Sequence, residues 1–344
     1  MYQGTGVNVR SGIAVLALLA IGSGAGGAEP EAGLATAPPE LLIAPTEQLD
    51  EVTVEGRWKG PQLWRIRRGD HVLWLLGTPE LLPEKMQWES SDVAGVLATA
   101  GELVMEPRFD ARLGYNVVRL ARLYREWRRV RVLPDGVTLA DVLDHNWFAR
   151  LEAQRQRLLP GDSLVVRQRP LMAMTQLFEA DRAQQRLRSG RSVGATVEKL
   201  ARAQRMPVTR ATIEIRTQDV DAVLKQLAGM PGAAEVNCLK TGIESLETDQ
   251  GTSALRARAW AVGDVATLRK LVVPNVRAVC TDVLSLIPSL QAALQSANQQ
   301  WLDATHRVLN ERPISFAVRS IEDILAPDGV LKVLRDRGDV IEGP

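Results

Sequence analysis

Leu63-Trp64-Arg65-Ile66-Arg67 and Val72-Leu73-Trp74-Leu75-Leu76 are the stretches that decide the fold, because both are rich in the branched and aromatic residues that favour strands. The sequence Arg68-Gly69-Asp70-His71 separates them, and a short link that contains glycine is typical of a hairpin. We therefore expect the folded part of the chain to begin near Leu63 with a β-hairpin.

Further strand-like segments lie towards both ends of the chain, with helical segments between them. The expected strands are Glu102–Glu106, Pro207–Thr209, Ile314–Val318 and Val340–Glu342. Apolar residues recur at helical spacing from about 110 to 200 and again from about 217 to 309. The sequence therefore predicts an α/β fold, with a mixed sheet built from N- and C-terminal strands and a large helical insertion.

The first residues have the pattern of a secretory signal peptide. Arg10 supplies the positive charge, the apolar run Ile13–Ile21 follows, and the small residues Gly22–Ala28 suit a cleavage site. The run is shorter than the ~20 residues that a membrane-spanning helix needs, although an uncleaved anchor is the alternative. We expect cleavage after Ala28, a periplasmic or secreted product, and no transmembrane segment after cleavage.

Three regions are expected along the chain. Residues 1–28 form the signal peptide, residues 29–60 form a flexible leader rich in Pro, Ala and Glu, and residues 61–344 form one α/β domain.

Charge gives no general attraction to nucleic acid, because 42 Lys and Arg face 41 Asp and Glu. We therefore expect no nucleic-acid partner. One segment is locally basic, and its members are Arg119, Arg122, Arg125, Arg128, Arg129 and Arg131. Helical spacing puts most of these arginines on one face, which we interpret as a solvated face, with a binding patch as the alternative.

Cys238 and Cys280 are the two cysteines of the chain. An isolated pair can form a disulfide in an oxidising compartment, but the sequence does not supply the distance that a bridge requires. A disulfide and two buried free thiols both remain open. The chain has no Cys-x-x-Cys pair for a metal, no Gly-x-Ser-x-Gly nucleophile elbow and no phosphate-binding glycine loop.

Five motifs occur in an order that resembles the TraB/GumN family, from about residue 63 to 342. They are Leu75–Pro83, Glu102–Glu106, Ala259–Asp264 with its Trp-x-x-Gly-Asp pattern, Asn298–Trp301 and Pro327–Leu331. The resemblance implies a fold related to the erythromycin-esterase and haem-binding ChaN-like folds. It also implies similarity to the Wnt-cleaving Tiki proteases, which are viewed as metal-dependent and use two Gly-x-x-His motifs with the glutamate of the second strand.

The chain departs from the family pattern where the site is expected. The first family motif is Gly77-Thr78-Pro79-Glu80, with a glutamate in place of histidine. The second is Ser320-Ile321-Glu322-Asp323, which lacks both the glycine and the histidine. Ala297 stands where the family has arginine, whereas Glu106 keeps the family glutamate.

The resemblance assigns catalysis and metal binding to Glu80, Glu106 and Asp323, and substrate binding to Asn298. If the three carboxylates meet at the ends of the strands, their oxygens would suit Mn²⁺, Mg²⁺ or Ca²⁺ rather than Zn²⁺, which usually takes nitrogen or sulfur ligands. Without a metal, their mutual repulsion would raise at least one pKa. If they do not meet, each is an ordinary solvated carboxylate.

Loss of the histidines, the glycine and the arginine argues against preserved chemistry. We expect a non-catalytic binding or scaffold relative of the family, with a peptide or an envelope protein as its partner. The alternative is a metal-dependent hydrolase of the peptidase kind, in which a carboxylate-bound metal activates water.

Overall fold

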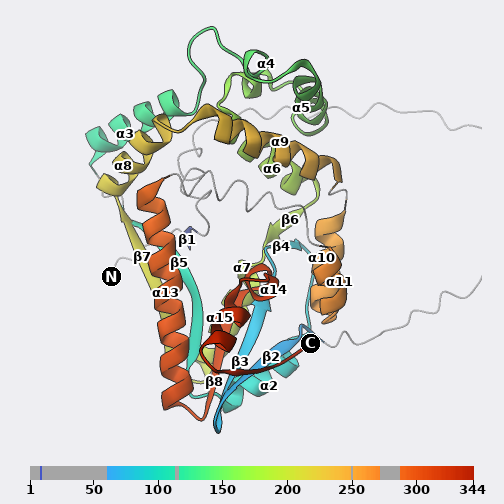
Figure 1. Cartoon of the computed structure of the whole chain (residues 1–344), viewed down its shortest axis with the longest axis vertical. Helices are drawn as coiled ribbons and strands as arrows, with labels where there is room; N and C mark the ends of the chain where they lie inside the picture. The colour runs from blue at the N-terminus through green and yellow to red at the C-terminus, as the bar shows by residue number, and fades with distance from the viewer. Residues whose placement is uncertain (1–7, 10–59, 113–115, 249–250, 272–286) are drawn as a thin grey trace, which may run out of the picture.

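The computed structural model describes residues 8–9, 60–112, 116–248, 251–271 and 287–344. It has the expected α/β architecture, with one main mixed sheet, helices beside it, and a group of helices across one end (Figure 1). The leader expected over residues 29–60 lies outside the described residues, apart from Gly60.

The main sheet is seven-stranded, in the order β1-β5-β8-β3-β2-β9, with β7 also paired to β5. Its strands are β1 (Asn8–Val9), β2 (Leu63–Arg68), β3 (His71–Thr78), β5 (Leu103–Arg112), β7 (Val208–Arg216), β8 (Ile314–Ser320) and β9 (Val340–Glu342). A separate small sheet pairs β4 (Leu81–Pro83) with β6 (Leu187–Ser189). Strands from both ends of the chain thus build the main sheet, as predicted.

The N-terminal hairpin is confirmed, because β2 and β3 pair antiparallel from Leu63↔Leu76 to Arg68↔His71. β3 then pairs in parallel with β8, from Val72↔Ile314 to Thr78↔Ser320. β8 also pairs in parallel with the start of β5. Since β3, β8 and β5 run the same way, their carboxyl ends lie at one edge of the sheet.

Helices account for most of the remaining described residues. The helices before β7 are α2 (Ser91–Thr99), α3 (Val117–Val130), α4 (Leu139–Val142), α5 (His145–Leu158), the 3₁₀ helix η1 (Ser163–Arg167), α6 (Pro170–Gln184) and α7 (Arg191–Ala203). The later helices are α8 (Thr217–Ala228), α9 (Gly232–Thr248), α10 (Thr252–Ala261), α11 (Val265–Lys270), α13 (Pro288–Glu311), α14 (Ile321–Leu325) and α15 (Val330–Asp336). Figure 1 shows α13 along one side of the sheet and α10 with α11 on the other, while α3 to α6, α8 and α9 lie across the top.

Side-chain caps define several helix starts. Asn116 accepts a hydrogen bond from the amide of Arg119 at 3.0 Å, and Asp144 accepts one from the amide of Trp147 at 3.1 Å. These bonds satisfy amides that have no partner within the helix.

Two clusters of buried hydrophobic side chains form the core. One packs on the main sheet and includes Leu73, Trp260, Trp301 and Phe316. The other lies among the helices across the top, with Trp127 of α3 as one member. The predicted helical insertion therefore has a core of its own.

Two strands are longer than the sequence predicted. The expected strand Glu102–Glu106 continues to Arg112, and the expected strand Pro207–Thr209 continues to Arg216. The two segments pair with each other as far as Arg112↔Arg216, with a register shift between Met105 and Arg108. β5 and β7 supply each other's backbone hydrogen-bond partners. The sequence of either segment alone therefore does not reveal how far its strand extends.

Cys238 of α9 is disulfide-bonded, which decides between the two states left open for the cysteines. The other cysteine of the chain, Cys280, lies outside the described residues.

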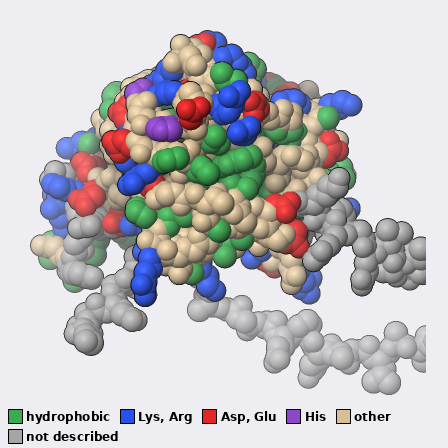
Figure 2. All heavy atoms as spheres, turned by 90° about the horizontal axis from the view of Figure 1, so that it is seen from below, with side chains coloured by type: hydrophobic (Ala, Val, Ile, Leu, Met, Phe, Trp, Pro, Cys, Tyr) green, Lys and Arg blue, Asp and Glu red, His purple; other side chains and the backbone are tan. Residues whose placement is uncertain are grey.

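The surface carries both signs of charge. Seen from below, hydrophobic side chains gather in the middle of the face, with Lys, Arg, Asp and Glu around them (Figure 2). Among the described residues, no helix combines the length and the apolar character needed to cross a bilayer.

Candidate functional site

Glu106 lies in β5 at the carboxyl edge of the three parallel strands, where ligand sites of α/β sheets usually form. Its residue is 8% exposed. Thr78, the last residue of β3, places its hydroxyl in hydrogen-bond contact with Oε1 of Glu106. The same hydroxyl lies 3.3 Å from the carbonyl oxygen of Arg319 in β8. Thr78, the second residue of the Gly77–Glu80 motif, therefore contacts residues of two other strands, β5 and β8.

Arg319 makes the second set of contacts at the carboxyl ends of these strands. Its Nε donates to Oδ2 of Asp323, and its Nη2 donates to Oδ1 of Asn298 at 2.8 Å. The guanidinium carbon also lies 4.9 Å from the ring centre of Trp301, within the range of a cation–π interaction. One arginine from β8 therefore joins α13 to α14.

The contacts of Arg319 bear on Ala297, the position at which an arginine was expected. The resemblance places an arginine directly before the asparagine of its Arg-Asn-x-x-Trp motif, and Ala297, which stands there, is 2% exposed. Arg319 reaches Asn298 and Trp301 from another element. The site therefore holds a fixed guanidinium, supplied by β8.

The second family motif also has internal contacts. The hydroxyl of Ser320 donates to Glu322 at 2.7 Å, and Arg256 of α10 donates to the other oxygen of Glu322 at 3.2 Å. The side chain of Ser320 is thus held by a hydrogen bond within the motif.

The three carboxylates predicted as ligands are engaged differently. Glu80 follows β3 and is exposed, Glu106 is buried against Thr78, and Asp323 faces Arg319. Within the part of the chain that the structure describes, no group of three His, Cys, Asp or Glu side chains is placed to hold a metal ion. The substrate-binding residue predicted from the motif, Asn298, is exposed on α13 and contacts Arg319.

The donor set does not fit a metal ion in this arrangement. A metal at Asp323 would have to compete with the guanidinium of Arg319, a fixed positive charge on the same carboxylate. We derive no reaction step through a metal.

The Trp-x-x-Gly-Asp motif supports the same edge. Nε1 of Trp260 donates to the carbonyl oxygen of Gly77 at 2.7 Å, and both residues are buried. Asp264 caps α11, accepting from the amide of Thr267 at 2.9 Å and from its hydroxyl at 2.6 Å. These hydrogen bonds, led by that of the hydroxyl, hold the pKa of Asp264 below its ordinary value.

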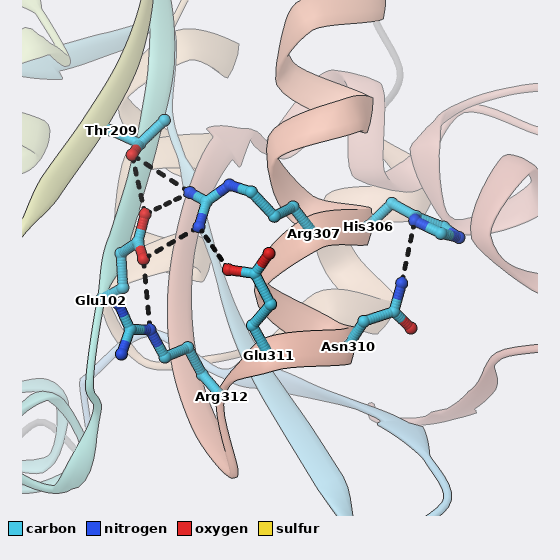
Figure 3. Close-up of polar contacts among 7 residues, drawn as sticks. All are labelled: Glu102, Thr209, His306, Arg307, Asn310, Glu311 and Arg312. Atoms are coloured by element: carbon cyan, nitrogen blue, oxygen red, sulfur yellow. Dashed lines mark hydrogen bonds and ion pairs between the residues drawn. The ribbon is translucent and has the colours of Figure 1, made fainter.

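A second polar cluster lies at the opposite edge of the sheet, around Glu102 (Figure 3). The Glu102 side chain is 4% exposed. It accepts hydrogen bonds from Arg307 at 3.2 Å, from Arg312 at 3.4 Å and from the hydroxyl of Thr209 at 2.7 Å. The hydrogen bond from Arg307 is the main reason that the pKa of Glu102 is lowered, against the opposing effect of burial. This cluster ties α13 to β5 and β7, and we interpret it as structural.

Thr78 and Arg319 are the site residues that the sequence did not predict. Thr78 lies inside the Gly77–Glu80 motif, in which only the glycine and the last residue were considered functional. Arg319 lies at the end of β8 and Asp323 lies in the following helix α14, so their contact depends on the turn between the strand and the helix, which the sequence does not give.

The model of the TraB/PrgY/gumN family matches residues 62–342 of the chain. Comparison with characterised proteins and with solved structures finds no match.

Proposed function

The chain belongs to the TraB/PrgY/gumN family, and from that premise we propose that it is a binding or scaffold member that has lost the family reaction. Its partner would be a peptide or a protein of the cell envelope. The observation that carries the proposal is Arg319, which engages Asp323, Asn298 and Trp301 together.

Charge neutralisation at the site supports this proposal. A hydrolytic metal site needs carboxylate oxygens that are free to bind a cation, with a water or substrate position left open. Here Asp323 is bound to a permanently charged guanidinium from its own strand–helix junction.

A fixed cation supports binding in particular. The guanidinium carbon of Arg319 lies 4.9 Å from the ring centre of Trp301, and the Arg319 side chain is 14% exposed. A ligand at this edge would meet that cation, which suits an anionic group such as a carboxylate.

The test is metal content and peptidase activity of the purified full chain supplied with Mn²⁺, Co²⁺, Ca²⁺ or Zn²⁺. Elemental analysis should find no stoichiometric metal, and mass spectrometry of an incubated peptide library should find no cleavage. A known metallopeptidase in the same buffers shows that the assay detects turnover. Glu106→Ala is the matched variant, because it removes the one site carboxylate that the family retains.

Metal-dependent cleavage that disappears in Glu106→Ala would overturn the proposal and favour the hydrolase. Zinc bound at one equivalent, with activity lost on chelation, would overturn it in the same way.

Export is the second part of the proposal. It is supported by Arg10, the apolar run Ile13–Ile21 and the small residues that follow. The disulfide at Cys238 is also consistent with an oxidising compartment.

A further inference from the structure

The arginine-rich segment forms α3, which lies at the outer edge of the group of helices across the top, above α8 (Figure 1). Two side chains of α3 are buried, Leu123 and Trp127. Both join the second hydrophobic cluster, so this side of the helix faces inward.

The opposite side of α3 faces outward and is strongly basic. Val118, Arg122, Arg125 and Arg129 follow each other at steps of four, three and four residues, which places them on one stripe of the helix. All four are exposed, and the stripe is about 16 Å long at 1.5 Å per residue. No Asp or Glu lies on it.

Two of the three stripe arginines are ion-paired, whereas Arg125 and the flanking Arg119 and Arg128 are not, within the part of the chain that the structure describes. Arg122 pairs with Asp221 of α8 at 3.0 Å, and Arg129 pairs with Glu126 at 3.4 Å. The exposed residues Arg119, Arg125 and Arg128 have no ion-pair partner among the described residues. Salt bridges within the molecule therefore do not explain why this face carries so many arginines.

Apolar side chains stand beside the arginines. Val117 is 77% exposed, Val118 is 81% exposed and Tyr124 is 43% exposed, and all three belong to α3. A surface of this kind, basic with exposed apolar residues, differs from one that only contacts phosphates of a nucleic acid. Arginine and lysine attract anionic headgroups, while apolar and aromatic side chains enter the boundary of the acyl chains.

We propose that the outward face of α3 binds the surface of membranes rich in anionic phospholipid. The arginines supply the attraction, and Val117, Val118 and Tyr124 supply shallow apolar contact. The helix lies along the surface rather than across the bilayer, because its inward face is already packed on the protein. This inference does not depend on whether the family site is catalytic.

The test is co-sedimentation of the full chain with vesicles of phosphatidylglycerol mixed with phosphatidylcholine, and with vesicles of phosphatidylcholine alone. Binding to the neutral vesicles measures how much the apolar run Ile13–Ile21 contributes to membrane binding, and every variant contains this run. The unmodified chain should bind the anionic vesicles more tightly, and the excess should fall steeply with added NaCl.

Neutralising Arg125→Gln together with Arg128→Gln should weaken binding to the anionic vesicles about 25-fold, since each arginine near such a surface raises affinity about fivefold. The matched control is Arg335→Gln with Arg337→Gln, which removes the same charge from exposed positions at the end of α15. It should leave binding unchanged. Val118→Gln should weaken binding without changing its dependence on salt.

Equal binding by the two double variants would overturn the proposal, as would equal binding to both kinds of vesicle or a lack of salt dependence in the unmodified chain. Binding to duplex DNA with no binding to anionic vesicles would also overturn it and assign the face to nucleic acid. The salt dependence of the unmodified chain tests the proposal even if a variant fails to fold.

Discussion

Arg319 determines the character of the carboxyl edge, because it holds Asp323 and Asn298 through hydrogen bonds and lies over Trp301. Its side chain is 14% exposed and that of Asp323 is 32% exposed. Partial burial strengthens the attraction between Arg319 and Asp323 relative to a fully exposed ion pair. The pair is still exposed enough that the cost of desolvating its charges does not cancel this attraction.

Arg319→Gln should therefore destabilise the protein by about 1–2 kcal/mol, measured by urea unfolding. The change also leaves Asp323 without this cation, so Ca²⁺ or Mn²⁺ should raise the thermal midpoint of the variant more than that of the unmodified chain. Lys332→Gln is the control, because Lys332 and Asp336 also pair at i and i+4 but are more than half exposed. A midpoint that rises equally in the unmodified chain would show that Arg319 does not exclude the cation.

Glu102 is the residue whose protonation should matter for stability. Its pKa is lowered in the folded protein, chiefly by the hydrogen bond from Arg307. A lowered folded pKa contributes stability above the unfolded value of about 4.3, and this contribution is lost as the pH falls through the folded value.

Glu102→Gln should destabilise the protein by about 1–3 kcal/mol at pH 7, and the difference from the unmodified chain should shrink below about pH 4. Urea unfolding at several pH values measures both quantities. Glu311→Gln should change stability by less than about 0.5 kcal/mol, since Glu311 pairs with Arg307 on the solvent side and is 55% exposed. A difference for Glu102→Gln that stays constant down to low pH would contradict the assigned role.

At the scale of elements, two glycines of the family motifs allow close packing around α14. A Cβ on Gly77 would lie 2.5 Å from Cδ1 of Ile321. A Cβ on Gly329 would lie 1.8 Å from the carbonyl oxygen of Asp323, a backbone atom that no rotamer can move away. The closing motif therefore needs glycine for space between α14 and α15.

Gly329→Ala should destabilise the protein by more than about 2 kcal/mol, because α14 or α15 must move to admit the methyl group. Gly95→Ala is the matched control, since Gly95 lies in the interior of α2 with nothing within 4 Å of the added atom. That change should stabilise by about 0.5–1 kcal/mol through helix propensity. Thermal unfolding of the two variants should give shifts of opposite sign.

The sequence predicted elements well where the pattern was local. The hairpin β2–β3 and the strand β8 were recognised from short runs of strand-forming residues. The second half of β7 was missed, because Arg210 to Arg216 becomes a strand by pairing with β5 and not by its own composition. The two short strands β4 and β6 were missed for the same reason.

The site was predictable in part. Motif order indicated that Glu80 and Asp323 follow strands of one sheet, which the parallel pairing of β3 with β8 agrees with. Glu106, expected to end its strand, instead lies within β5, which continues to Arg112. The contacts of Glu106 and Asp323 were not predictable, since the orientation of Thr78 and Arg319 depends on packing between distant segments. Whether these carboxylates act in catalysis stays a prediction.

At the scale of the whole molecule, we expect the mature protein to lack the first residues of the chain. If the signal peptide is removed as proposed, N-terminal sequencing of protein from the envelope fraction should begin at Glu29. Such cleavage would also remove β1, whose residues Asn8 and Val9 pair with Asp110 and Phe109 of β5. Membrane-held protein that still begins at Met1 would instead identify the apolar run as an anchor.

The position of β8 has a consequence for the order in which the protein is made. β8 lies between β3 and β5 in the sheet, but it is synthesised after both of them. Until residues 314–320 leave the ribosome, β3 lacks its parallel neighbour and the halves of the sheet have nothing to join them. Because the strand that joins the two halves is made after both of them, the sheet cannot close until nearly the whole chain has been synthesised, and such non-local pairing slows folding.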